Sequence, residues 1–179
     1  MKNFKYGFTL IELLIVIALL GALAVGLLAA LDPFEQLKKG TDTGIRNTVS
    51  EVHGAAIRFY AVKGNMPWCS ATASTTCKNP SSSTLTTANG GTSTTSPYAM
   101  ITQMATAGEL KSDFVTLAGT QMDNIWVTGS ATTPSIAVCF LPKAKSFQAD
   151  KNTKYTIAGA PTTGCKSQGG ANDCYWCVK

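Results

Sequence analysis

The sequence predicts an α+β protein in which a long amino-terminal helix packs part of its length on a small antiparallel β-sheet. Three observations predict this class. An uncharged apolar run extends from Leu13 to Leu31, an amphipathic helical pattern follows it, and short apolar runs typical of strands fill residues 124–179. Short strands with brief turns favour an antiparallel sheet laid against a helix.

The apolar run is long enough to cross a membrane. At 1.5 Å per residue it forms a helix of about 28 Å, close to the thickness of a bilayer's hydrocarbon core. Lys2 and Lys5 precede the run, and Gly7 separates them from Phe8. A carboxylate, Glu12, lies directly before the run; it is costly in lipid and should therefore have a partner.

Two ordinary interpretations of this segment are a secretory signal peptide and a plain membrane anchor. A secretory signal peptide has an apolar region of 7–15 residues, which is shorter than this run, and does not contain an acid such as Glu12. A plain membrane anchor would keep Lys2 and Lys5 on the cytoplasmic side. In that case Glu12 would lie at the level of the lipid headgroups, about one turn into the helix.

A third interpretation explains more of the segment. The residues KYG-FTLIELLIVIALLGALA resemble the class III leader of type IV pilins and pseudopilins. The resemblance covers Gly7, Phe8, Thr9, Leu10, Ile11, Glu12 and the aliphatic residues that follow. It implies that a membrane peptidase cuts between Gly7 and Phe8, and that the new amino terminus at Phe8 is methylated. A glycine before the cut lets a protease approach the backbone closely.

The same resemblance implies a role for Glu12 in assembly. In a stack of parallel helices, the ammonium group of Phe8 can approach Glu12 of a neighbouring subunit. Such a pair sets the axial register, because a slip would leave a carboxylate unpaired in a medium of low dielectric constant.

The helix is expected to consist of two parts, residues 8–31 and residues 32–63. Asp32 at the N-cap and Pro33 at the first helical position predict a kink or a restart there. Gly21 and Gly26 would weaken the first part, where many pilins have a proline instead. The second part has an apolar stripe at helical spacing and ends near Gly64; the stripe comprises Ile45, Val49, Val52, Ala56 and Phe59.

The remaining residues, 64–179, are expected to form a globular head. Residues 70–96 are rich in serine and threonine and predict a solvated loop, either plain or O-glycosylated. A short helix is expected at 97–107 and a β-meander at 124–179. The run from Ile136 to Leu141 is continuously apolar, which is typical of a central strand.

Six cysteines follow the apolar run, and their even number indicates disulfides formed in an oxidising compartment. The CxxC pair near the end lacks the helix that a redox motif requires, and the other spacings do not suit zinc. Cys69–Cys77 would close a short loop; the other four could pair as Cys139–Cys177 with Cys165–Cys174 or otherwise. The six are Cys69, Cys77, Cys139, Cys165, Cys174 and Cys177.

No catalytic constellation is visible in the sequence, which has one histidine, His53, and no phosphate-binding loop. We therefore expect no enzyme activity, no cofactor and no metal. The basic residues form no run, so the sequence gives no strong signal for a nucleic-acid partner. The resemblance implies a filament subunit that lies in the inner membrane as a single-pass protein before assembly and in a cell-surface pilus afterwards, with roles in adhesion or motility. Its implied partners are copies of itself, prepilin peptidase and an assembly platform. Alternatives are a pseudopilin of a secretion system, a minor pilin, or an anchored binding module.

Overall fold

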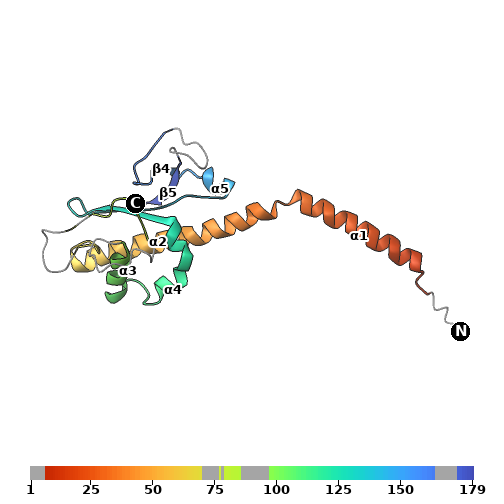
Figure 1. Cartoon of the computed structure of the whole chain (residues 1–179), viewed down its shortest axis with the longest axis horizontal. Coiled ribbons are helices and arrows are strands. Elements are labelled where there is room, and N and C mark those ends of the chain that lie inside the picture. The colour runs from red at the N-terminus through yellow and green to blue at the C-terminus, as the bar shows by residue number, and fades with distance from the viewer. Residues whose placement is uncertain (1–6, 70–76, 78, 86–96, 164–172) are drawn as a thin grey trace. The chain divides into compact units, whose positions relative to one another are not determined.

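The computed structural model describes residues 7–69, 77, 79–85, 97–163 and 173–179. The chain divides into two compact units, residues 1–37 and residues 38–179 (Figure 1). In order, the helices are α1 (Leu10–Ala30), α2 (Pro33–Lys63), α3 (Pro97–Thr106), α4 (Phe114–Ala118), the 3-10 helix η2 (Gly119–Asn124) and α5 (Lys145–Gln148). The strands are β1 (Ser83–Thr84), β2 (Ile125–Ser130), β3 (Ser135–Phe140), β4 (Thr153–Tyr155) and β5 (Tyr175–Val178).

Helix α1 is apolar on all sides. None of its residues is buried, and its length and composition suit a helix that crosses a membrane. The helix continues without interruption through Gly21 and Gly26 and ends at Ala30. A new helix starts at Pro33, where Oδ1 of Asp32 accepts a hydrogen bond from the backbone N–H of Glu35 at 3.2 Å. The restart occurs there because proline lacks the N–H that a continuous helix requires.

Helix α2 supplies one side of the core of the second unit. Its predicted stripe from Ile45 to Phe59 is buried, together with Ala55 and a carboxylate, Asp42. The stripe belongs to a single apolar cluster that also contains the inner faces of β2 and β3, Met100 and Met104 of α3, and Trp176. The methionines of α3 are fully buried and fill the core.

The sheet is antiparallel, in the order β1-β2-β3-β5-β4, so the prediction of a meander was wrong. In a meander β4 would lie beside β3, but β5 takes that place. Burial explains this arrangement: Trp176 and Cys177 of β5 are buried, whereas Lys154 of β4 is exposed and suits an edge strand. The central position predicted for the Ile136 run is occupied by β3.

The serine- and threonine-rich segment is not entirely a solvated loop. Ser83 and Thr84 pair with Val127 and Trp126 of β2, and Leu85 is fully buried. Burial of Leu85 removes a large apolar side chain from water and so helps to hold the segment against the core. Its other residues, except Cys77 and Asn79–Ser82, lie outside the described part of the chain.

Two disulfides join described residues of the second unit. Cys69 is bonded to Cys77, and Cys139 of β3 is bonded to Cys177, its direct cross-strand partner on β5. The second bond lies on the outer face of the sheet with Ala137, Tyr155 and Tyr175. Cys165 lies outside the described residues, so its pairing with Cys174 stays a prediction.

Candidate assembly site

The start of α1 brings together the residues around the predicted cut. Gly7 and Phe8 precede the helix in non-helical backbone, and the side chain of Phe8 is 75% exposed. A Cβ built on Gly7 would meet nothing within 4 Å. The bond between these residues is therefore in a segment that a protease could bind in extended form, two residues before the first helical residue.

Thr9 and Glu12 form a capping box at the helix start. Glu12 Oε2 accepts hydrogen bonds from the backbone N–H of Thr9 at 2.8 Å and from Thr9 Oγ1 at 2.7 Å. In return, the backbone N–H of Glu12 donates to Thr9 Oγ1 at 3.3 Å. These bonds satisfy groups that the first turn of a helix leaves without partners.

The capping box also orients Glu12. Its carboxylate turns back along the helix toward the cut rather than outward from the helix side. Both bonds from Thr9 end on Oε2, so Oε1 can accept from a further donor. A cation that arrives near Phe8 would therefore meet a carboxylate whose direction is already fixed.

The role of Thr9 was missed in the sequence analysis, although its signal is present. A threonine followed three residues later by a glutamate, just before an apolar run, is the sequence signature of a capping box. The resemblance assigns roles to Gly7, Phe8 and Glu12 but none to Thr9. Local geometry adds Thr9 as the residue that holds Glu12.

The comparisons with known proteins concern this same segment. A family model described as the prokaryotic N-terminal methylation motif matches residues 2–28. Residues 2–28 carry the methylation motif. The methylation motif is typical of type IV pilins and pseudopilins, so the predicted resemblance to their leader is confirmed. The chain matches no curated protein and no solved structure.

The methylation motif points to a family of structural subunits rather than to an enzyme. It implies processing by prepilin peptidase and assembly into a pilus, and with the apolar α1 it fits membrane anchoring followed by an extracellular location. Among the residues that the structure describes, no group of three or more His, Cys, Asp or Glu side chains is placed to hold a metal ion.

Proposed function

We propose that the chain is a structural subunit of an extracellular type IV pilus filament, cut between Gly7 and Phe8 and polymerised through α1. The methylation motif, which extends over most of an apolar helix without a buried residue, is the observation that supports this proposal most. The motif is shared with pseudopilins, which form short assemblies, so filament length distinguishes the two.

The exposed surface of α1 explains why assembly would be favourable. Every large apolar side chain of this helix is at least 43% exposed, so the helix requires apolar surroundings. Before the cut, lipid surrounds it. After extraction from the membrane, neighbouring copies of α1 surround it, and each buried leucine or isoleucine contributes about 1.5–3 kcal/mol relative to exposure in water.

Glu12 would set the register of this bundle. Cleavage gives Phe8 a free ammonium group, which methylation leaves positively charged. In the bundle this group approaches Oε1 of Glu12 on the next copy, while Thr9 keeps the carboxylate in place. Gly21 and Gly26 are the positions where the helix would loosen during assembly, because glycine weakens a helix by about 1 kcal/mol relative to alanine.

The test expresses the full chain with prepilin peptidase and a pilus assembly platform, and then shears filaments from the cells. Mass spectrometry should find a mature chain that begins at N-methylated Phe8, and electron microscopy should find long filaments. Glu12→Ala should be cut normally but should not assemble. Glu35→Ala, which removes the same side chain from the first turn of α2, should assemble normally.

Three results would each contradict the proposal: a mature chain that keeps Met1, loss of α1 together with the leader, or full assembly of Glu12→Ala. Normal display of a monomeric chain on the cell surface would indicate an anchored binding module. Short assemblies that never leave the envelope would indicate a pseudopilin.

A further inference from the structure

Large apolar side chains remain exposed beyond the end of α1. Phe34 and Leu37 lie in the first two turns of α2, and they are 76% and 71% exposed. Both belong to the same compact unit as α1, residues 1–37. Residues three apart on a helix are neighbours on its surface, so the two side chains form one apolar side. The start of α2 therefore presents an apolar side that the other described residues leave exposed.

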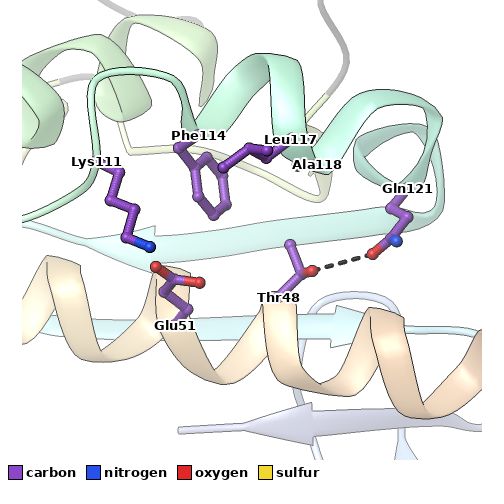
Figure 2. Close-up of a pocket in the computed structure, with 7 residues that line it drawn as sticks. All are labelled: Thr48, Glu51, Lys111, Phe114, Leu117, Ala118 and Gln121. Carbon is purple, nitrogen blue, oxygen red and sulfur yellow. Dashed lines mark hydrogen bonds between the residues drawn. The ribbon is translucent and has the colours of Figure 1, made fainter.

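The hollow between α2 and α4 in the second unit is different in kind (Figure 2). Its volume is about 130 Å³, and on one side Thr48 Oγ1 donates a hydrogen bond to Gln121 Oε1 at 3.0 Å. On the other side, the oppositely charged ends of Glu51 and Lys111 point toward each other. A small hollow whose polar groups face one another does not require a partner. The apolar start of α2 is the stronger indication of one, because it follows the apolar α1 directly in the chain.

The length of α1 keeps the start of α2 close to the membrane surface. α1 has 21 residues, which form a helix of about 32 Å, and the hydrocarbon core of a bilayer is about 30 Å thick. Phe34 is four residues beyond Ala30, and four residues of chain span at most about 14 Å. When α1 crosses the membrane, Phe34 is therefore held within reach of the headgroup layer, whichever direction α2 takes.

The polar residues beside this apolar side carry no net charge. Residues 32–39 contain two acids, Asp32 and Glu35, and two bases, Lys38 and Lys39. Asp32 caps α2, since its Oδ1 accepts a hydrogen bond from the backbone N–H of Glu35 at 3.2 Å. A neutral segment gives no preference for a strongly acidic or basic partner. It suits the boundary between acyl chains and headgroups, where apolar side chains insert and polar neighbours stay in the headgroup layer.

We propose that Phe34 and Leu37 insert into this boundary on the side of the membrane where α2 emerges, while α1 crosses the bilayer. The inference rests on the membrane stage of the proposed function, before the cut and the extraction. The two side chains give the chain a second, interfacial attachment in addition to the spanning helix. Extraction of a subunit into a filament must then remove Phe34 and Leu37 from lipid as well as α1.

The test places the full, uncut chain in vesicles of phosphatidylethanolamine with a minor share of phosphatidylglycerol. Part of the lipid carries bromine, which quenches tryptophan fluorescence on contact, either close to the headgroup or deep in the acyl chain. Phe34→Trp and Leu37→Trp each add one tryptophan to the three of the wild-type chain. Subtracting the wild-type signal isolates the added tryptophan.

We expect shallow bromine to remove at least about half of the added fluorescence, and deep bromine clearly less, because an interfacial side chain lies only about 5–10 Å into the boundary. High salt should not change the quenching, since residues 32–39 carry no net charge. Val62→Trp is the matched control. Val62 is 67% exposed and lies near the other end of α2, so bromine at either depth should leave its added fluorescence unchanged.

Three outcomes overturn the inference. The first is emission of Phe34→Trp and Leu37→Trp at the wavelength of tryptophan in water, without quenching. The second is emission typical of a buried tryptophan without quenching, which would mean that another copy of the chain, and not lipid, buries these positions. The third is equal quenching of Val62→Trp, which would mean that contact with lipid is not specific to the start of α2.

None of these outcomes depends on filaments, because the vesicles contain neither prepilin peptidase nor an assembly platform. The inference can therefore fail while the chain still assembles through α1 and Glu12. If instead the wild-type chain does not float with the vesicles at all, α1 does not hold it in a membrane, and the proposed function fails.

Discussion

Asp42 of α2 caps the turn that leads into α5, more than a hundred residues further along the chain. Its Oδ2 accepts hydrogen bonds from the backbone N–H groups of Ala144 at 2.7 Å and Lys143 at 2.8 Å. Asp42 is fully buried, and its Oδ1 has no hydrogen-bond partner among the described residues. Ala144 is the N-cap of α5 and has no side-chain acceptor of its own. A distant carboxylate thus satisfies N–H groups that the local sequence leaves without a partner.

We expect Asp42→Ala to destabilise the protein by about 3 kcal/mol, because two N–H groups would lose their acceptor, one of them buried. Asp42→Asn should cost less than half of this, since its amide oxygen can accept the same bonds. Urea unfolding of the full chain in detergent, followed by tryptophan fluorescence, measures both.

The matched control is Asp113→Ala. Asp113 is itself the N-cap of α4, but it is exposed and its side chain makes no capping hydrogen bond. Its removal should change the free energy of unfolding by no more than about 0.5 kcal/mol. Equal losses for Asp42→Ala and Asp42→Asn would show that the carboxylate's charge, and not its acceptor oxygen, stabilises the turn.

Thr9 is expected to support assembly through Glu12. Thr9→Val removes the hydroxyl that donates to Glu12 Oε2 and accepts from the Glu12 N–H. Loss of such a cap costs about 1 kcal/mol, or roughly a fivefold change in an equilibrium constant. We therefore expect a lower assembled fraction of cut subunits for Thr9→Val and a normal fraction for Thr9→Ser. Cutting itself should not change, because Gly7 and Phe8 remain. A normal assembled fraction for Thr9→Val would mean that Glu12 needs no support.

Local patterns predicted the elements of this fold better than their connections. The stripe on α2, the restart at Pro33 and the apolar β3 each follow from spacing or from one residue's chemistry. The position of β5 beside β3 does not follow from a local pattern, because it depends on whether β4 or β5 buries more apolar surface against β3. The buried surfaces of these two strands can be compared only in the three-dimensional structure of the core. The short helices α4, η2 and α5 escaped prediction for a similar reason, since each is only 4–6 residues long.

The functional residues divide in the same way, into those that a local sequence pattern predicts and those that only the three-dimensional structure reveals. Gly7, Phe8 and Glu12 were found because the methylation motif is contiguous in sequence. Asp42 was missed although it lies three residues before Ile45, in line with the buried stripe. An aspartate in such a position is normally assigned to solvent, because a buried carboxylate is costly without hydrogen bonds. Only the structure shows that Lys143 and Ala144 supply them.

His53 should make stability depend on pH. It is half-buried on α2, and burial lowers the pKa of its imidazole below the ordinary value of about 6.5. Above that pH the imidazole is neutral in both states. As the pH falls below it, the unfolded chain takes up a proton that the folded chain resists, so the free energy of unfolding decreases until the folded pKa is passed.

We expect the unfolding free energy of the wild-type protein, minus that of His53→Gln, to decrease as the pH is lowered from about 7.5 to about 5.5. Urea unfolding of both proteins across this range measures it. Because the two proteins share all other titrating groups, subtraction isolates His53. A difference that stays constant or rises as the pH falls would show that the folded state does not resist protonation of His53.

The two described disulfides should differ in their contribution to stability. Cys139–Cys177 closes a loop of 38 residues and Cys69–Cys77 one of 8 residues. Restricting the unfolded chain gives about 3.9 kcal/mol for the longer loop and about 2.5 kcal/mol for the shorter one. Cys139→Ala/Cys177→Ala should therefore lower the free energy of unfolding more than Cys69→Ala/Cys77→Ala.

Guanidinium unfolding of the two double variants compares them directly, and each serves as the other's control because both lose two cysteines. The longer loop also contains β4, and its disulfide fastens β5 to β3 in the middle of the sheet. Its loss should for that reason expose the outer face around Tyr155 and Tyr175 to proteases first. An equal or larger loss for the Cys69–Cys77 variant would mean that Trp68 and Leu85 depend on that disulfide more than the central sheet depends on its own.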